Sequence, residues 1–377
     1  MSNTSIYLIA GEVSGDTHGA ELMHVLKDSI PGVSLLGTGG PEMREASNGA
    51  TRDWVEDAAV MGIWEVLKHY SWFKEQFDLI LKEVIKAKPD ALVLIDYPGF
   101  NLRMAKAVRE ALPKTKIIYY ISPQVWAWNK GRIPKMAELL DQMICIFPFE
   151  KPIFEEAGLP TEFVGHPIVD ELIEKKIATQ RDPKLIGLFP GSREREVARL
   201  FPVMLETARR LSSEHPLIKF QAPAASERLA IQMRALLEKA ELSEELVVIT
   251  TGDSHALMQS ACCGVIASGT ATLEAAYYGL PYCLMYRIAW PTYFIGKMLV
   301  KVDYIGLVNI LAGKQVVEEF IQGDADPCHI KYALDKFLVD SEFTDTVKAE
   351  LAETAAKLGE PGCHQRAAQC VLKVLAS

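Results

Sequence analysis

The chain has 377 residues, which is long for a single hydrophobic core, so its length predicts two domains. Hydrophobic residues make up 49% and charged residues 24% of the sequence, as in an ordinary soluble globular protein. The formal net charge of −9 argues against broad nucleic-acid binding, which needs a basic surface, although a local basic patch would be compatible with it.

The cysteines and the apolar segments also limit the class of protein. The seven cysteines are an odd number with no CxxC spacing, so neither a disulfide framework nor a zinc ribbon is expected. Scattered cysteines of this kind favour a reducing cytoplasm, and we predict no metal site. No basic leader precedes the first expected strand, so no signal peptide is predicted. The apolar segment 288–295 is far shorter than the roughly 18 to 20 residues that a membrane span requires.

Apolar, strand-like segments alternate with helix-like segments in the first half of the chain. Strands are expected at residues 5–10, 33–37, 91–96, 116–121, 142–147 and 161–165. They are apolar on both faces, as buried parallel strands are, and the alternation predicts a doubly wound sheet. Helices are expected at 20–29 and 101–111, with a turn over 11–19 before the first of them. Residues 1–170 form the first predicted domain.

The alternation weakens between residues 167 and 183, where charge rises and no strand is expected, so this segment is interpreted as a linker. Strands are then expected at 185–189, 218–222, 246–250, 264–267 and 281–286, which gives a second domain over residues 184–325. Residues 326–377 keep helical spacing of apolar positions without a strand. These C-terminal helices must pack on one domain or bridge both.

The turn Pro190-Gly191-Ser192-Arg193 follows the first strand of the second domain. Gly191 allows a ligand to approach the backbone, and Ser192 is a natural N-cap for the helix that follows. The free N–H groups of that helix would bind an anion, with the forked cation of Arg193 beside it. This geometry suits a phosphate or diphosphate. The alternative is an ordinary strand–helix turn with a surface arginine.

A second polar turn, Ser268-Gly269-Thr270, follows a later strand of the same domain. Its hydroxyls and backbone N–H groups, together with Thr272, again lie at an expected helix N-terminus. Glu274 comes about one turn into that helix, where its carboxylate could accept hydrogen bonds from a ribose diol or could stabilise the helix dipole. Combined with Arg193, these residues predict a nucleotide-diphosphate site.

Asp96 ends a buried apolar strand of the first domain. A carboxylate that leaves a core at a strand end is partly desolvated, which favours a role as proton acceptor. It could also cap the next helix, but Asn101 is better placed for that. The segment GEVSGD offers Ser14 and Asp16 on a turn and matches neither a GxGxxG fingerprint nor a Walker loop. His166 is interpreted as a hinge or capping residue rather than as a catalyst.

Two segments have the composition of a lipid-contacting surface. Residues 61–85 can form a helix with apolar groups on more than one face, including Trp72 and Leu79 opposite the core stripe. Residues 288–302 mix Phe294 and other apolar side chains with lysines, as interfacial helices do. Core packing is the alternative for each segment. Together they favour local contact with a membrane or an acyl chain.

Several strings, in colinear order over nearly the whole chain, resemble the lipid-A-disaccharide synthases. They are GEVSGD (11–16), AVMGI (59–63), IDYPGFN (95–101), SPQVWAW (122–128), PGSR (190–193), SGTATLE (268–274) and NILAG (309–313). The resemblance implies a GT-B glycosyltransferase fold of α/β class. Two Rossmann-like, doubly wound parallel-sheet domains would face each other across a cleft, with the donor bound mainly to the second. The C-terminal helices would pack back on the first domain.

The implied reaction is inverting. It moves 2,3-diacylglucosamine from UDP-2,3-diacylglucosamine to the 6-hydroxyl of 2,3-diacylglucosamine 1-phosphate, and it uses no metal or cofactor. The enzyme would be cytoplasmic and peripheral to the inner face of the inner membrane, and a homodimer is compatible with this. Alternatives are another UDP-sugar enzyme of GT-B fold, such as a UDP-N-acetylglucosamine epimerase, or a non-catalytic nucleotide-sugar or lipid-binding protein. A Rossmann dehydrogenase is disfavoured because no GxGxxG follows the first strand.

The resemblance also implies roles for individual residues. Asp96 would be the base, Arg193 and the helix N-termini after Ser192 and Ser268 would stabilise the departing diphosphate, and Glu274 would hold the ribose. Further substrate contacts would come from Ser14, Asp16 and Asn309. The family often has a second aspartate where this chain has Gly99, so Asp96 carries the base role alone.

Overall fold

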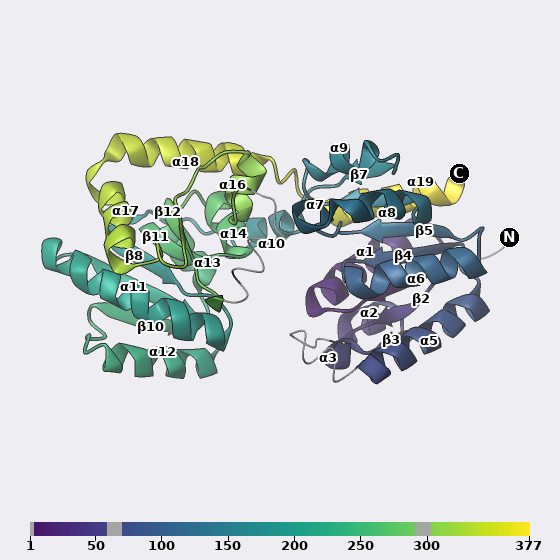
Figure 1. Ribbon diagram of the computed structural model, residues 1–377, viewed down its shortest axis with the longest axis horizontal. Coiled ribbons are helices and arrows are strands. Elements are labelled where there is room, and N and C mark those ends of the chain that lie inside the picture. The colour runs from purple at the N-terminus through teal and green to yellow at the C-terminus, as the bar shows by residue number, and fades with distance from the viewer. Residues whose placement is uncertain (1–3, 59–69, 291–292, 294–302) are drawn as a thin grey trace. The chain divides into compact units, whose positions relative to one another are not determined.

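The computed structural model describes residues 4–58, 70–290, 293 and 303–377 of the chain. The chain forms two compact units, which we call unit 1 (Met1–Pro167 with Gly359–Ser377) and unit 2 (Ile168–Leu358). Each unit is built around a parallel sheet with helices packed on it (Figure 1). The predicted α/β class with two parallel-sheet domains is therefore confirmed.

Unit 1 has a seven-stranded sheet within the described residues, in the order β3-β2-β1-β4-β5-β6-β7, and its neighbouring strands are parallel. The strands are β1 (Ser5–Ala10), β2 (Ser34–Gly39), β3 (Thr51–Asp53), β4 (Ala91–Ile95), β5 (Lys116–Tyr120), β6 (Gln142–Cys145) and β7 (Thr161–Phe163). The helices are α1 (Val13–Ser29), α2 (Pro41–Ala46), α3 (Val55–Ala58), α5 (Tyr70–Ala87), α6 (Pro98–Ala111), α7 (Val125–Trp128), η1 (Lys130–Arg132), α8 (Ile133–Leu139), α9 (Glu150–Glu155) and α19 (Cys363–Ala376). Of these strands, only β3 was not predicted, because three residues are too few to show a pattern.

The sheet of unit 1 is buried on both faces, as its apolar runs predict. Tyr7, Leu92 and Ile117 belong to one buried cluster with side chains of α5 and α6. On the other face, Tyr120 of β5 meets α19, with its hydroxyl 3.5 Å from the Sγ of Cys363. The C-terminal helix therefore completes the core of unit 1.

Two local expectations in unit 1 are wrong. The helix α1 begins at Val13, so the GEVSGD segment is not a turn. Gly19 lies inside this helix because it packs against α2, where a Cβ atom would come within 2.5 Å of the Met43 Sδ. The helix α6 begins at Pro98 rather than at Asn101, since proline is favoured in the first turn of a helix.

Unit 2 has a six-stranded parallel sheet in the part of the chain that the structure describes, in the order β10-β9-β8-β11-β12-β13. The strands are β8 (Asp182–Phe189), β9 (Lys219–Ala224), β10 (Val247–Thr251), β11 (Ala261–Ala267), β12 (Tyr282–Tyr286) and β13 (Glu319–Ile321). The helices are α10 (Ile168–Glu174), α11 (Glu194–Glu214), α12 (Glu227–Lys239), α13 (Ser254–Ser260), α14 (Ala271–Tyr277), α16 (Leu307–Ala312), α17 (Pro327–Val339) and α18 (Ser341–Ala356). The short edge strand β13 was not predicted.

The boundaries of unit 2 differ from the expected ones in two places. The segment 167–183 is not a bare linker, because it contains α10 and the start of β8. The C-terminal segment does not stay together either: α17 and α18 belong to unit 2, and α19 belongs to unit 1. The reason is that Ile330, Ala333 and Leu334 of α17 are buried in the core of unit 2.

Candidate active site

The turn after β8 is built around Gly191. Its φ of +102° is a left-handed conformation that side chains disfavour, and a Cβ atom there would lie 2.5 Å from an oxygen of Glu196. The following helix, α11, begins at Glu194 with Arg193 as its N-cap residue. Ser192 is therefore not the N-cap that the sequence predicted; it lies one residue further out and lines the pocket described next.

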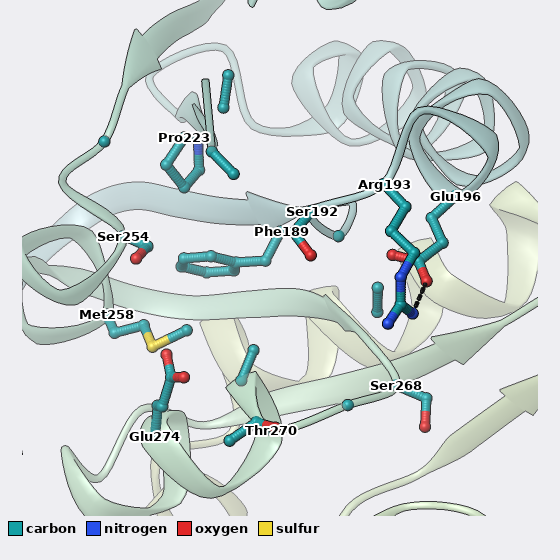
Figure 2. Close-up of a pocket in the computed structure, with 17 residues that line it drawn as sticks. Phe189, Ser192, Arg193, Glu196, Pro223, Ser254, Met258, Ser268, Thr270 and Glu274 are labelled. Atoms are coloured by element: carbon teal, nitrogen blue, oxygen red, sulfur yellow. Dashed lines mark hydrogen bonds and ion pairs between the residues drawn. The ribbon is translucent and has the colours of Figure 1, made fainter. Parts of the chain in front are cut away.

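A pocket of about 350 Å³ lies at the carboxyl edge of the sheet of unit 2, where ligands of open parallel sheets bind (Figure 2). Most of the residues that the sequence predicted for a nucleotide site line it together. They are Gly191, Ser192, Arg193, Ser268, Gly269, Thr270 and Glu274. Two turns that are far apart in the sequence thus line one pocket, with Arg193 and Glu274 at different ends of it.

Arg193 is poised at the start of α11. Its Nη1 donates a hydrogen bond to the Glu196 Oε1 at 2.9 Å, and 63% of its side chain remains exposed. An exposed ion pair of this kind contributes little to stability, about 0 to 1 kcal/mol. The guanidinium can therefore leave Glu196 and pair with a diphosphate instead. The backbone N–H groups at the start of the helix would donate hydrogen bonds to the same diphosphate.

Thr272 does not reach the pocket. It is fully buried in α14, and its hydroxyl donates to the carbonyl oxygen of Gly269 at 2.7 Å. Its own carbonyl oxygen accepts a hydrogen bond from the Tyr282 hydroxyl at 3.0 Å. Its hydroxyl thus shapes the turn around Gly269, whose φ is +154°, and the prediction of a direct ligand contact is wrong.

Glu274 is mostly buried at the edge of the pocket, with 19% of its side chain exposed. Burial, with a smaller contribution from the nearby Glu171, raises the pKa of Glu274 to about 7, and Lys175 partly opposes this rise. The Nδ1 of His255 lies 4.0 Å from its Oε2. A carboxylate with such a pKa can accept two hydroxyl hydrogen bonds once it ionises, which fits a ribose diol.

Further lining residues, which were not predicted, come from the ends of β9 and β10 and from α13. They are mainly small or apolar: Pro223, Ala224, Ala225, Gly252, Ser254 and Met258. Their position could have been found from the rule that ligands bind beyond the carboxyl ends of strands, since both strands were expected. Together with Phe189 they give the pocket an apolar region that could accept a nucleotide base.

In unit 1, Asp96 lies directly after β4 in a conformation with φ of +44°, and the next residue, Tyr97, has φ of +48°. Two consecutive left-handed residues without glycine are strained, and such strain is concentrated at functional sites. Three hydrogen bonds hold this backbone in place. The Nδ2 of Asn101 donates to the carbonyl oxygens of Ile95 at 3.1 Å and of Asp96 at 2.8 Å. The Tyr119 hydroxyl also donates to the Asp96 carbonyl oxygen. Asn101 thus braces the turn rather than capping α6.

The carboxylate of Asp96 has the character of a base. Burial raises its pKa to about 6, the charge of Glu12 adds to the rise, and the Tyr97 N–H opposes it. A carboxylate with this pKa is ionised near neutral pH and yet basic enough to accept a proton. Gly99, where the family often has a second aspartate, is exposed in the first turn of α6.

Three weaker predictions fare differently. Asp16 is buried, and its carboxylate accepts hydrogen bonds from the backbone N–H groups of Gly40 (2.7 Å), Glu42 (3.0 Å) and Met43 (3.0 Å), so it caps α2 instead of facing a ligand. Ser14 is exposed in the first turn of α1, and its contact with a substrate stays a prediction.

Asn309 is fully buried and also has a structural role. Its Oδ1 accepts hydrogen bonds from the N–H groups of Val316 (2.8 Å) and Val317 (3.0 Å), and its Nδ2 donates to the Val317 carbonyl and to the Glu319 Oε1, both at 2.8 Å. Asn309 therefore fastens α16 to the segment before β13. It has no hydrogen-bonding capacity left for a sugar.

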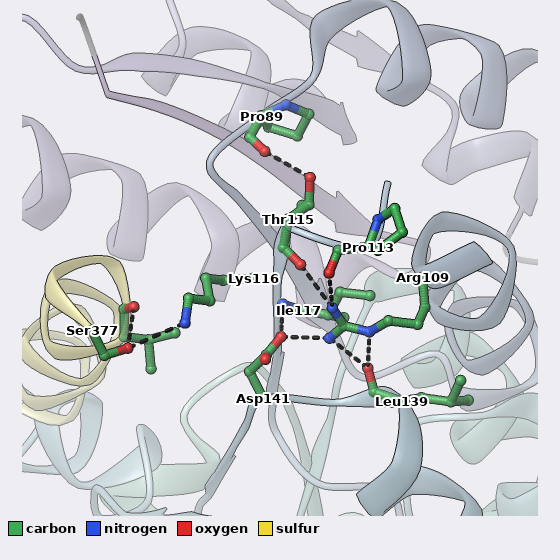
Figure 3. A network of polar contacts seen from close by, with 10 residues as sticks. Pro89, Arg109, Pro113, Thr115, Lys116, Ile117, Leu139, Asp141 and Ser377 are labelled. Atoms are coloured by element: carbon green, nitrogen blue, oxygen red, sulfur yellow. Dashed lines mark hydrogen bonds and ion pairs between the residues drawn. The ribbon is translucent and has the colours of Figure 1, made fainter. Parts of the chain in front are cut away.

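A polar network at the opposite, amino edge of the unit 1 sheet shows what a purely structural cluster looks like (Figure 3). Arg109 pairs with the Asp141 carboxylate at 2.5 Å and donates to the carbonyl oxygens of Leu139, Pro113 and Thr115. Asp141 also accepts the N–H of Ile117 at 2.7 Å. These contacts fix the loops before β5 and β6, and they differ from the exposed Arg193 pair of unit 2.

His166 follows β7 and packs against Phe147, with ring centroids 5.1 Å apart. Burial lowers the pKa of His166 to about 3, so its ring is neutral at physiological pH.

The described residues contain no group of three or more histidines, cysteines, aspartates or glutamates that could hold a metal ion.

Comparison with known proteins decides the family. The family model of the lipid-A-disaccharide synthetases matches residues 6–374. The lipid-A-disaccharide synthase of Geobacter sulfurreducens is 41% identical over 383 residues, which cover 99% of this chain and 98% of that protein. The chain belongs to the lipid-A-disaccharide synthase family. It is therefore a glycosyltransferase of lipid A biosynthesis, as the sequence motifs predicted.

Solved structures support the same fold. MnaA of S. aureus in complex with UDP has a TM-score of 0.64 at 11% identity, covering 99% of this chain and 98% of that one. A ugt transferase of Siraitia grosvenorii in complex with UDP has a TM-score of 0.61 at 12% identity, covering 100% of both chains. At these identities the likeness shows the fold alone, which is the predicted GT-B fold.

The lipid-facing predictions for this family member fall partly outside the described residues, which omit 59–69 and Phe294. Trp72 is partly buried and packs against the core, with its ring stacked on Trp54 at a centroid distance of 6.0 Å, which favours the core-packing alternative for this side chain. Leu79 is 41% and Trp290 55% exposed. Among the described residues, none of the helices has the length and apolar character needed to cross a bilayer.

Proposed function

We propose that this enzyme transfers 2,3-diacylglucosamine from UDP to the 6-hydroxyl of 2,3-diacylglucosamine 1-phosphate with inversion, and that its pocket in unit 2 binds the donor. The observation that carries the donor assignment is that two distant turns, one with Arg193 and one with Glu274, line a single pocket. Arg193 and the start of α11 would hold the diphosphate, Glu274 would hold the ribose, and the apolar floor beside Phe189 would take the base.

Asp96 would be the general base. Its carboxylate accepts the proton of the 6-hydroxyl while that oxygen forms a bond to the anomeric carbon of the donor. The bond between the anomeric carbon and the diphosphate oxygen breaks, and UDP leaves with the electron pair. The charge that grows on the diphosphate is stabilised by the guanidinium of Arg193. A single displacement of this kind inverts the anomeric centre.

The substrates carry acyl chains, so we propose that the enzyme works as a peripheral protein at the cytoplasmic face of the inner membrane. Exposed Leu79 on α5 and Trp290 after β12 support this, since large apolar side chains on a surface favour contact with lipid. Replacing both with serine should release the protein from vesicles in a sedimentation assay. An unchanged bound fraction would count against this location.

The experiment that tests the reaction is incubation with UDP-2,3-diacylglucosamine and the 1-phosphate acceptor, followed by detection of UDP and disaccharide. Disaccharide formed in equal amount to UDP supports the proposal. If no disaccharide forms and a parallel incubation with UDP-N-acetylglucosamine yields its 2-epimer, an epimerase is favoured instead. Binding of the donor without any product would favour a nucleotide-sugar-binding protein.

A further inference from the structure

Unit 2 has a second hollow at the carboxyl edge of its sheet, and the mechanism proposed above assigns no role to it. Its volume is about 440 Å³, and its lining residues are Arg199, Arg287, Ile288, Trp290, Gln322 and Gly323. Arg199 lies on α11 in the turn after Glu196, a residue of the donor pocket, whereas Arg287 and Gln322 directly follow β12 and β13. The hollow is therefore a neighbour of the donor pocket with its own set of side chains.

The charge of this hollow is unusual for so acidic a protein. It is lined by two arginines and no described carboxylate. Arg209 and Arg210 on the same helix both pair with Glu206, but no described residue forms an ion pair with Arg199 or Arg287. Two guanidinium groups around one hollow repel each other until an anion neutralises them, and their forked donors match phosphate geometry.

Gln322 holds Arg287 in position. It is buried and has a φ of +54°, which is rare for a residue other than glycine. Its carbonyl oxygen accepts a hydrogen bond from the Arg287 Nε at 3.1 Å. Its side-chain amide accepts from the N–H of Ile288 at 2.7 Å and donates to the Ile288 carbonyl at 3.1 Å. Because only the Nε of Arg287 is used in this way, a pre-organised guanidinium keeps its Nη groups for a ligand.

We propose that Arg199 and Arg287 bind the phosphate monoester of the acceptor. This inference rests on the proposed function, in which the acceptor carries a 1-phosphate that none of the residues discussed above recognises. Trp290, 55% exposed, gives the hollow an aromatic rim on which the sugar or the first carbons of an acyl chain can pack. The site explains why a chain of net charge −9 keeps a local pair of arginines here.

The test compares Arg199→Gln and Arg287→Gln with the wild type in detergent micelles. For each variant, the KM for the phosphorylated acceptor should rise about tenfold or more, while kcat and the donor KM stay within about twofold, because a charge-assisted hydrogen bond to the acceptor alone is lost. With an acceptor that lacks the phosphate, wild type and variants should have the same KM. Arg209→Gln is the matched control: Arg209 is exposed on the same helix, far from its first turn, and lines neither hollow, so this variant should behave as wild type.

Each other outcome contradicts a specific part of the proposal. An unchanged acceptor KM in both variants, or an equal loss with the acceptor that lacks the phosphate, overturns the phosphate site. If the variants lose binding to phosphatidylglycerol vesicles but keep the wild-type KM in micelles, the hollow binds a headgroup phosphate and the acceptor assignment is wrong. If the wild type forms no disaccharide, the proposed function itself has failed, and the inference fails with it.

Discussion

The carboxyl edges of the two sheets look alike in sequence but differ in how their polar side chains are used. In unit 1, Asp16 and Asn101 are buried. Asp16 accepts hydrogen bonds from backbone N–H groups of a neighbouring turn, and Asn101 donates hydrogen bonds to backbone carbonyl oxygens. In unit 2, Arg193 is largely exposed and Glu274 lines a pocket. A polar segment after a strand can therefore support the fold in one unit and line a pocket in the other.

The difference lies in which backbone groups are left without partners. In unit 1 the N-terminal N–H groups of α2 are satisfied by a carboxylate from α1, so they cannot bind an anion. In unit 2 the helix α11 has no side-chain cap, and its first N–H groups lie beside the pocket. In the proposed mechanism, unit 1 would contribute a base, Asp96, and unit 2 would contribute an anion site. The predictions below test this division of roles.

The largest effect is expected for the base. Asp96→Asn removes the proton acceptor and should lower kcat by about 10² to 10⁴-fold, the usual contribution of a positioned base, while UDP affinity stays as in wild type. Turnover assays and calorimetric titration with UDP measure the two quantities. Asp90→Asn is the matched control, because Asp90 is exposed before the same strand and its side chain accepts the Ser5 N–H. A variant that keeps wild-type turnover would exclude Asp96 as the base.

Asp16 tests the structural half of the comparison. Asp16→Ala leaves three backbone N–H groups of the α2 turn without their acceptor and should lower the free energy of unfolding of unit 1 by about 3 kcal/mol. Denaturation in urea measures this loss. UDP affinity should not change, since the carboxylate has no ligand role. Loss of UDP binding at unchanged stability would return Asp16 to the substrate site.

Arg193 tests the ligand half. Arg193→Gln should weaken UDP binding by about 10- to 100-fold, because a charge-assisted hydrogen bond to the diphosphate contributes roughly 1.5 to 3 kcal/mol. The unfolding free energy should hardly change, since the Arg193–Glu196 pair is exposed. Titration with UDP is the measurement, and Arg228→Gln, which removes another exposed arginine of unit 2, is the control. Equal affinity in wild type and Arg193→Gln would place the diphosphate elsewhere.

The smallest effects are those of pH. The pKa of Asp96 is about 6, so kcat should be constant well above pH 6 and fall about tenfold for each pH unit below it, as the base is protonated.

The pKa of Glu274 is about 7, so UDP binding should weaken as the pH falls through 7, because only the ionised carboxylate accepts both ribose hydrogen bonds. In Glu274→Gln this component should vanish. If wild type and variant show the same pH dependence of UDP affinity, Glu274 does not hold the ribose.

The fold was largely predictable, since buried parallel strands have long apolar runs that alternate with helical patterns. β3 and β13 were missed because three residues carry no period, and α1 was started too late because glycine usually marks a turn. The split of the C-terminal helices could not be derived, as amphipathic spacing indicates that a helix packs but not on which unit.

The candidate site was predictable where the chemistry is local. The turns at Arg193 and Glu274 carry their own signals, and the pocket brings them together. Asp16 and Asn309 were misassigned because their partners are remote in sequence, at Gly40 and Glu319. A single sequence shows that a polar residue follows a strand. It does not show whether that side chain already forms hydrogen bonds with a remote part of the chain. The strain at Asp96, with φ of +44°, was likewise visible only in the structure.

Hydrogen exchange with and without UDP tests most directly whether unit 2 alone supplies the diphosphate site. Saturating UDP should slow amide exchange in residues 190–196 and 268–275, and leave residues 11–18 and 96–101 unchanged. Protection in the turns of unit 1 without protection around Arg193 would contradict the account.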